Sequence, residues 1–325
     1  MGLTSAYTLI ENSVPGNEIT LISKHFPGDL SSFYASPVAG AVTDCLKVTD
    51  SRELEWYKYT YSNLGRLQEL LGEHCGLSQG FATEFWEKDA PIDSINLMKH
   101  FTEDFEYVEV QNDATIGIRF KSWGFNTPLF LKTLTSFLVD KGVTLIKQEL
   151  ENISDAFNTK TKVVFNCSGL GARTLKGVED LKVFPTRGQV VVVRSPHIKE
   201  SILQWGNEST YVIVRPDSNH EVVLGGFYEP YNWNKDVLQH ETLNILERTT
   251  KLCPQLLSNL DSISGLQIVR VASAFRPSRE GGPRLEKETS KDGTVIIHNY
   301  GASGSGYSRC LGMAHECVKI ALDEN

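Results

Sequence analysis

The 325-residue sequence has no long hydrophobic run, no excess of basic residues and no closely paired cysteines. Its apolar runs reach about five residues, far short of the roughly 20 that a membrane-spanning helix needs. The 32 basic and 40 acidic residues give a net charge of −8, which disfavours nucleic acids and anionic membrane surfaces as partners. The six cysteines show no CxxC spacing, so we expect no disulfide framework and no metal site. These absences leave a soluble globular protein of a reducing compartment.

Neither end of the sequence predicts a targeting signal. The first residues have no basic segment and no small-residue cleavage site, so a secretory signal is not indicated. The last residues, ALDEN, do not match a peroxisomal tripeptide. We therefore expect a cytoplasmic or peroxisomal protein.

Helical and strand periodicities alternate at both ends of the chain, and strands dominate between them. Helices are expected over residues 3–10 and 52–75, from Thr127-Pro128 to Gly142, near 240–253, and at the C-terminus. Strands are expected at 18–23, 162–166, 189–194, 211–215, 221–224, 266–275 and 294–300. This order predicts an α/β fold in which a Rossmann-like nucleotide-binding domain is interleaved with a β-rich α+β domain.

Three glycine-rich stretches could bring bare backbone close to a ligand. His298–Gly306 (HNYGASGSG) joins a predicted strand to the last helix, whose N-terminus favours electron-rich atoms. Asn166–Ala172 (NCSGLGA) follows another predicted strand, where open α/β sheets bind ligands. Met1-Gly2-Leu3 opens the first helix and indicates nothing on its own. An ordinary turn is the alternative for the first two stretches, although the first has more glycine and serine than a turn needs.

Arg276, Tyr211 and Tyr228 are the candidate substrate-binding side chains. A fixed guanidinium can bind a carboxylate through two parallel hydrogen bonds, and Arg276 follows a strand-like segment. The two tyrosines stand near adjacent predicted strands that a pleated hairpin could bring together. The alternatives are a solvated surface charge for the arginine and core packing for the tyrosines. The spacing builds neither a nucleophile triad nor an acid–base carboxylate pair.

Several motifs together resemble those of the D-amino acid oxidase family, whose cofactor is FAD. The matching segments are Ser31–Ala41, Arg187–Gln189, Tyr211–Pro216, Gly225–Tyr228, Phe275–Arg279, and Ile296–Gly306 with Gly312–Ala314. The resemblance spans nearly the whole chain, from Gly2 to about Leu322. It implies an FAD-binding domain of residues 1–45, 140–188 and 265–325. Residues 46–139 and 189–264 would then form the substrate-binding and interface domain.

The resemblance implies a role for each candidate residue. Arg276 would bind the substrate α-carboxylate with help from the Tyr211 hydroxyl, Tyr228 would orient the substrate, and the Gly304 carbonyl would accept a hydrogen bond from the α-amino group. The positions implied at the cofactor are Gly2, Ser31, Ser32, Ala39, Gly40, Ser168, Gly169, Ser303, Ser305, Gly306, Tyr307 and Ser308. The last helix is expected to begin at this final stretch and to favour the negative charge of the reduced flavin.

The implied reaction is oxidation of a D-amino acid by hydride transfer to the flavin, followed by hydrolysis of the imine and reoxidation by dioxygen. The products are a 2-oxo acid, ammonia and hydrogen peroxide. Relatives that act on D-aspartate have a second cation near the position of Tyr228, and residues 205–210 supply none. A neutral D-amino acid is therefore favoured over D-aspartate. The resemblance also leaves a homodimer open.

The family pattern begins with a strand and a G-x-G-x-x-G turn, and this sequence matches it from the third glycine, Gly2. Since that strand is central in such sheets, we expect a gap with unpaired backbone groups on both sides. The acidic residue expected for the ribose at the end of the second strand is replaced by Ser23-Lys24-His25. A non-catalytic relative unable to hold FAD is thus one alternative. A sarcosine- or glycine-oxidase-type enzyme is another, and the HNYG and RPSR segments disfavour it.

Overall fold

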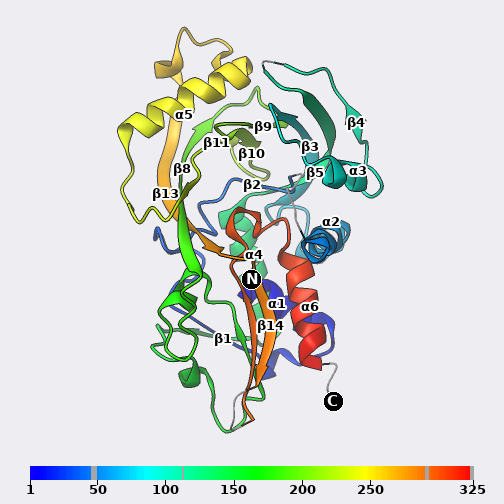
Figure 1. The fold of residues 1–325 in the computed structure, drawn as a ribbon, viewed down its shortest axis with the longest axis vertical. Coiled ribbons are helices and arrows are strands. Elements are labelled where there is room, and N and C mark those ends of the chain that lie inside the picture. Colours follow the sequence, from blue (N-terminus) through cyan, green and yellow to red (C-terminus); the bar gives the residue numbers. More distant parts are fainter. Residues whose placement is uncertain (45–49, 112, 290–292, 323–325) are drawn as a thin grey trace.

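The computed structural model describes residues 1–44, 50–111, 113–289 and 293–322, whose strands form three sheets. The largest has ten strands in the order β12-β8-β11-β10-β9-β3-β5-β2, with β13 also on β8 and β4 on β5 (Figure 1). Its strands are β2 (Ala41–Val42), β3 (Leu77–Trp86), β4 (Glu106–Tyr107), β5 (Ile116–Phe125), β8 (Val183–Arg194), β9 (Ser201–Trp205), β10 (Thr210–Val214), β11 (Glu221–Gly225), β12 (Glu229–Pro230) and β13 (Gln267–Arg279). All pairs are antiparallel except β3 with β9.

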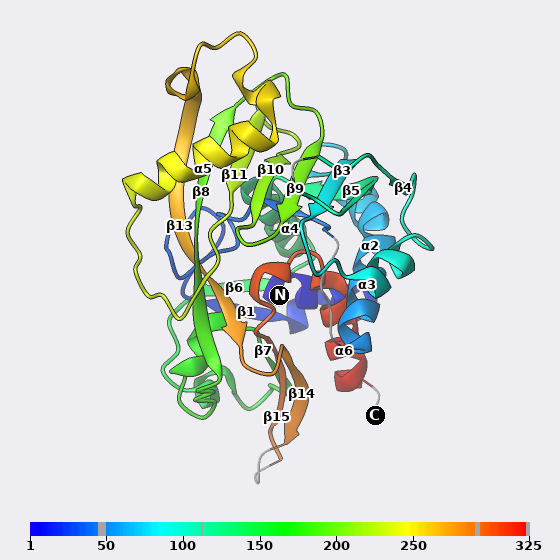
Figure 2. The same ribbon diagram turned by 45° about the horizontal axis from the view of Figure 1, so that its top comes forward.

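The run of four valines in β8 is buried on both faces of this sheet. Val190 and Val192 point into a cluster with Leu203 of β9, whereas Val191 and Val193 pack with residues of α5 (Gln239–Leu252). Figure 2 shows α5 lying across β8, β10 and β11. A continuous apolar run is typical of a strand covered on both faces.

The second region contains two small sheets and most of the helices. β1 (Thr20–Ser23) pairs in parallel with β6 (Thr144–Lys147), and a separate sheet has the order β14-β15-β7. Its strands are β7 (Val163–Asn166), β14 (Arg284–Thr289) and β15 (Val295–Tyr300). The α-helices outside α5 are α1 (Gly2–Glu11), α2 (Ser51–Leu71), α3 (Ile92–Met98), α4 (Thr127–Asp140) and α6 (Cys310–Leu322), and six short 3-10 helices, η1 to η6, lie in the connections. None of the described helices is long and apolar enough to span a bilayer.

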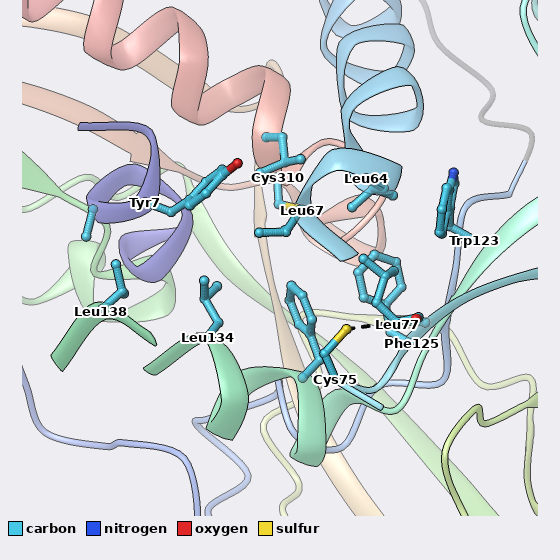
Figure 3. Close-up of a cluster of buried hydrophobic side chains, with 14 of the residues drawn as sticks. Tyr7, Leu64, Leu67, Cys75, Leu77, Trp123, Phe125, Leu134, Leu138 and Cys310 are labelled. Atoms are coloured by element: carbon cyan, nitrogen blue, oxygen red, sulfur yellow. Dashed lines mark hydrogen bonds between the residues drawn. The ribbon is translucent and has the colours of Figure 1, made fainter. Parts of the chain in front are cut away.

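A buried cluster joins these helices to the large sheet (Figure 3). It contains Tyr7 of α1, Leu64 and Leu67 of α2, Leu134 and Leu138 of α4, Cys310 of α6, and Leu77 and Phe125 of the sheet. Each helix packs one apolar face around shared sheet residues, which positions the N-termini of α1 and α6. Both N-termini line the cavity described below.

The two small sheets of the second region are separated at the expected gap. In the described part of the chain, no strand pairs with the second edge of β1 or of β7. α1 packs against both strands, and all residues of both strands line one cavity. The parallel sheet is therefore interrupted between β1 and β7, which agrees with the expectation.

Several expectations about element bounds are wrong. The Thr127-Pro128 pair is typical of an N-cap followed by the first helical residue, but Asn126 is the N-cap of α4, and Thr127 and Pro128 are its first two residues. α6 begins only at Cys310, because residues 306–309 form turns. The long strands β3 and β5 were not expected at all.

Candidate active site

A single cavity of about 2880 Å³ brings the predicted site residues together. It extends from the N-terminus of α1 and the strands β1 and β7 to the face of the large sheet. The predicted residues that line it are Gly2, Ser31, Ala39, Gly40, Ser168, Gly169, Tyr211, Tyr228, Arg276, Ser303, Gly304, Ser305, Gly306, Tyr307 and Ser308. Ser32 does not line it, and its hydroxyl lies 3.5 Å from the Lys235 carbonyl oxygen.

Arg276, on β13, presents its guanidinium to this cavity. Its Nη1 donates to the carbonyl oxygens of Phe227 (3.0 Å) and Arg187 (3.4 Å). Among residues 1–44, 50–111, 113–289 and 293–322, no carboxylate forms an ion pair with it. The guanidinium carbon lies 5.7 Å from the centre of the Tyr228 ring. An arginine held by neutral carbonyls and left without an acid can bind the carboxylate of a ligand.

Two glycines make room for the side chains of Arg276 and Tyr211. A Cβ atom at Gly188 would lie 2.3 Å from Nη1 of Arg276, and one at Gly225 would lie 2.3 Å from the Tyr211 hydroxyl. Gly188 is paired with Ala274 of β13, and Gly225 with Tyr211 of β10. The positions of both side chains therefore depend on a glycine in the neighbouring strand.

The glycine-rich stretch after β15 turns sharply against β13. Gly301 has φ +87°, and Ser303, the first residue of η6 (Ser303–Ser305), has φ +52°, which is uncommon for a residue with a side chain. Gly304 approaches the Arg276 side chain, because a Cβ atom there would lie 3.5 Å from its Cδ. Ala302 forms an isolated β-bridge with Ser278. The stretch is thus held directly beside the arginine.

The end of the stretch is tied to the loop that precedes β2. The Tyr307 hydroxyl donates to the Ser36 carbonyl oxygen (2.9 Å), and burial raises the pKa of Tyr307 well above its usual value. The Ser308 hydroxyl lies 3.2 Å from the Val42 carbonyl oxygen and 2.9 Å from Oδ1 of Asp44. Both hydroxyls therefore point into the protein.

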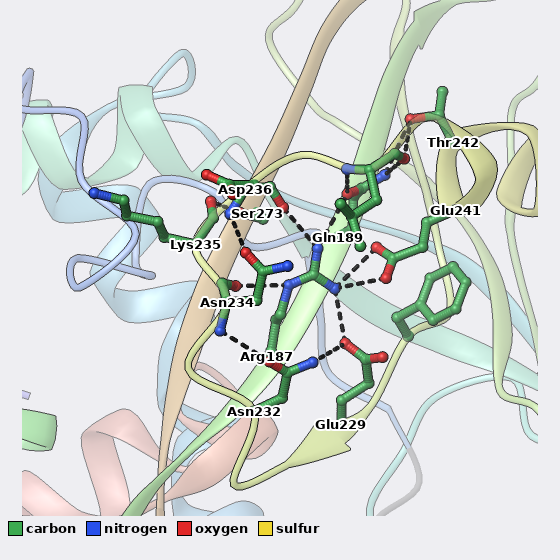
Figure 4. Close-up of polar contacts among 12 residues, drawn as sticks. Arg187, Gln189, Glu229, Asn232, Asn234, Lys235, Asp236, Glu241, Thr242 and Ser273 are labelled. Carbon is green, nitrogen blue, oxygen red and sulfur yellow. Dashed lines mark hydrogen bonds and ion pairs between the residues drawn. The ribbon is translucent and has the colours of Figure 1, made fainter.

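A buried ion cluster anchors the segment that follows Tyr228 (Figure 4). Arg187 is fully buried, and its Nη1 contacts Glu229 (2.7 Å) and Glu241 (2.8 Å). Its Nε and Nη2 donate to the carbonyl oxygens of Asn234 and Asp236, each at 2.7 Å. Arg187 of β8 thus holds residues 229–241 in place. Because Tyr228 directly precedes these residues, the same contacts help to fix its position.

The same segment contacts the loop of residues 31–40 through aromatic side chains. Trp233 lies 6.4 Å from Phe33 and 5.9 Å from Phe275, measured between ring centres, and Phe33 meets Phe275 edge-on at 5.2 Å. The Phe275 amide donates to the Ser32 carbonyl oxygen (2.8 Å). Residues 229–241 and the loop of residues 31–40 therefore contribute to one aromatic cluster.

The far end of the cavity suits a phosphate group. α1 starts there with no side-chain cap and no acidic residue in its first turn, so its free N–H groups favour an anion. At the end of β7, Nδ2 of Asn166 meets the ring of buried His298 (3.1 Å), and its Oδ1 accepts from the Ser168 amide (3.2 Å).

The comparisons with known proteins agree with this geometry. The family model described as FAD dependent oxidoreductase (DAO) matches residues 1–320. The chain belongs to this family. It is 36% identical to the D-amino-acid oxidase of Schizosaccharomyces pombe over 99% of this chain and 93% of that protein. It is 33% identical to the D-amino-acid oxidase of Fusarium vanettenii over 98% of this chain and 93% of that protein.

More distant matches share the fold of this FAD dependent oxidoreductase. A D-aspartate oxidase of Cryptococcus neoformans is 28% identical over 98% of this chain and 94% of that protein. The solved glycine oxidase of Geobacillus kaustophilus superimposes with a TM-score of 0.76 at 17% identity, covering 96% of this chain and 91% of that one. These matches confirm the expected fold class, and family membership confirms that FAD is the cofactor.

The cavity fits FAD in its chemistry and its extent. The glycine-rich stretch after β15 lies at one end of the cavity, and the uncapped start of α1 lies at the other. Typical ligand pockets measure roughly 300–1,000 Å³, so the volume exceeds what one ligand needs. Part of the excess is the space between β1 and β7. When bound, FAD supplies the hydride acceptor.

Sequence reasoning missed two glycines of the site. Gly188 and Gly225 lie within the segments RGQ and GGFY that carried the resemblance. Their roles depend on cross-strand neighbours, which a single sequence does not specify.

Proposed function

We propose that the protein catalyses the FAD-dependent oxidation of D-amino acids. The observation that carries this proposal is the Arg276 guanidinium, which lines the cavity without a carboxylate partner among the described residues and lies beside Tyr228 and Gly304. The similarity to two proteins named D-amino-acid oxidase supports it. Overall, a D-amino acid, dioxygen and water give a 2-oxo acid, ammonia and hydrogen peroxide.

The proposed division of labour leaves redox chemistry to the cofactor and positioning to the protein. Arg276 binds the α-carboxylate with the Tyr211 hydroxyl, Tyr228 orients the substrate, and the Gly304 carbonyl accepts a hydrogen bond from the amino group. We propose Gly2 and Ser168-Gly169 at the phosphate end of the cofactor. The residues proposed nearer the flavin are Ser31, Ala39, Gly40, Ser303, Ser305, Gly306, Tyr307 and Ser308, with Ser32 acting through the loop backbone.

We further propose a neutral side chain as the preferred substrate. Trp86, Leu203 and Trp205 line the cavity together with Tyr211 and provide an apolar wall. The acidic Asp89 also lines the cavity and would repel a second substrate carboxylate. D-Aspartate is the second candidate, because the exposed Lys88 also lines the cavity.

Three further predictions concern domain organisation, oligomeric state and location. We propose that residues 1–45, 140–188 and 265–325 form the FAD-binding unit and residues 46–139 and 189–264 the substrate unit. A homodimer and a cytoplasmic or peroxisomal location stay predictions.

The test is the visible absorbance spectrum of the purified protein with FAD, before and after anaerobic addition of D-alanine. We expect a flavin spectrum that bleaches with D-alanine and not with L-alanine. Arg276→Met should keep the flavin spectrum and lose bleaching at D-alanine concentrations that saturate the unmodified protein. Arg194→Met is the matched control, because Arg194 lies at the far end of β8 and donates to the Asn219 carbonyl oxygen. A protein that binds FAD but is bleached by no D-amino acid would contradict the proposal.

A further inference from the structure

Four hydroxyl groups form a continuous chain from the cavity into the protein interior. The Tyr228 hydroxyl lies 3.2 Å from Oγ of Ser303, which lies 2.8 Å from Oγ of Ser278, which lies 2.7 Å from Oγ1 of Thr186. Tyr228 is 56% exposed, whereas Ser278 is 3% and Thr186 0% exposed. One end of the chain of hydroxyls therefore opens to the cavity, and the other end is fully enclosed.

The elements that carry these hydroxyls also carry the arginine. Arg276 and Ser278 are two residues apart on β13, so their side chains lie on the same face of the sheet. Thr186, on β8, is the cross-strand partner of Arg276. The hydroxyl chain and the carboxylate-binding guanidinium therefore share one pair of strands.

The backbone at Ser303 suggests that its side chain is needed there. Its φ of +52° costs a residue with a Cβ more than it costs glycine, and glycines stand at positions 301, 304 and 306 of the same stretch. The bridge between Ala302 and Ser278 holds the strained turn in place. The Ser303 hydroxyl is what connects Tyr228 to the strand pair.

The proton count gives the chain a direction. Each hydroxyl has one proton to donate. If Tyr228 donates its proton to a ligand in the cavity, it can only accept from Ser303, which then accepts from Ser278, which accepts from Thr186. Hydrogen bonds aligned head to tail in this way polarise one another.

We propose that Ser278 and Thr186 are positioning residues that, through Ser303, hold the Tyr228 hydroxyl with its proton directed at the substrate carboxylate. This inference rests on the proposed function, because that function supplies the carboxylate. Neither Ser278 nor Thr186 touches the substrate in it. Their effect reaches the substrate only through Tyr228.

The test measures carboxylate binding separately from turnover. Benzoate has a carboxylate and no amino group, so calorimetric titration of the FAD-loaded protein gives a dissociation constant without reaction. Thr186→Val removes the hydroxyl of residue 186 at nearly constant side-chain shape, and Ser278→Ala removes the hydroxyl of residue 278. Thr186→Ser keeps a hydroxyl at position 186 and is the matched control. We expect Thr186→Val and Ser278→Ala to raise the benzoate Kd and the KM for D-alanine about three- to tenfold, with kcat within about twofold. Thr186→Ser should stay within about twofold of the unmodified protein.

A double-mutant cycle with Tyr228→Phe distinguishes positioning from a general structural effect. In the Tyr228→Phe background, Ser278→Ala and Thr186→Val should cause no further change in the benzoate Kd. Equal effects in both backgrounds, or a lower melting temperature with an unchanged Kd, would overturn the inference. So would an FAD-loaded protein that does not bind benzoate.

The two proposals fail in different ways. A protein that oxidises D-alanine normally but shows an additive cycle keeps the proposed function and loses the hydroxyl chain. A protein that oxidises no D-amino acid but binds benzoate with a non-additive cycle loses the proposed function and keeps the chain's action on Tyr228.

Discussion

Gly188 lies directly against the guanidinium of Arg276, so that a Cβ atom at Gly188 would lie 2.3 Å from Nη1 and 2.8 Å from Nη2. The two residues are on the paired strands β8 and β13, whose register fixes the close approach. No side chain can be accommodated at position 188 while Arg276 keeps its observed position. The glycine therefore helps to position the guanidinium that we propose binds the substrate carboxylate.

Gly188→Ala should impair substrate binding more than folding. The contacted atoms are the far end of a flexible side chain, which can move away and leave its hydrogen bond to Phe227. Loss of one charge-assisted hydrogen bond costs about 1.5–3 kcal/mol, so we expect the KM for D-alanine to rise at least tenfold. Steady-state kinetics measures this. Gly80→Ala on β3, where a Cβ atom meets nothing within 4 Å, is the control and should leave KM unchanged.

Arg187 contributes to stability through the charges that it neutralises. Arg187→Met leaves Glu241, whose side chain is 4% exposed, without its ion pair, and such a loss typically costs about 3–5 kcal/mol. The free energy of unfolding from urea denaturation should fall by this amount. Adding Glu241→Met should recover part of the loss, because the stranded carboxylate is then removed. A double variant no more stable than Arg187→Met would show that the buried charge is not the cause.

The sequence pointed to residues that line one cavity, but it did not predict all strands of the sheet that supports them. Arg276, Tyr211 and Tyr228 lie in short segments whose residue types are chemically informative, and the cavity brings all three together. β3 and β5 were missed because their alternation is broken by glycines at positions 80, 117 and 124, and their burial comes from partners distant in sequence. Tertiary pairing, which propensity alone does not specify, decides such strands.

The contacts that position the site residues could not be predicted from the sequence either. The approach of Gly188 to Arg276 and the bonds from Thr186 to Ser278 follow from the β8–β13 register. That register contains a bulge between Ile268 and Arg270, and a shift of one residue there would turn each side chain to the other face. The gap between β1 and β7 was predictable because it follows from matching one motif at Gly2.

Lys88 provides a test between the two substrate classes. Its Nζ donates to Oδ1 of Asn207 (2.7 Å), and it lines the cavity, as the acidic Asp89 also does. With a neutral preference, the unmodified protein should have a higher kcat/KM for D-alanine than for D-aspartate, and Lys88→Ala should change the D-alanine value less than about twofold. A preference for D-aspartate that disappears in Lys88→Ala would instead assign the acidic substrate.

His298 should make stability depend on pH in the weakly acidic range. Burial, reinforced by the positive charge of Arg284, lowers the pKa of His298 below its usual value of 6.5. The unfolded chain therefore binds a proton more readily than the folded protein, and stability falls as the pH drops below about 6.5. Stability should be complete above that pH and decrease toward the lower pKa of the folded state. Melting temperatures between pH 7.5 and 5 measure the decrease, which should be smaller in His298→Gln. An equal decrease in the variant would assign the pH dependence to other groups.

The contacts of the His298 ring explain the expected sign. The neutral imidazole can donate from Nε2 to Glu288 (3.1 Å) while Nδ1 accepts from Asn166. Protonation places a second donor opposite the Asn166 amide and removes that acceptor.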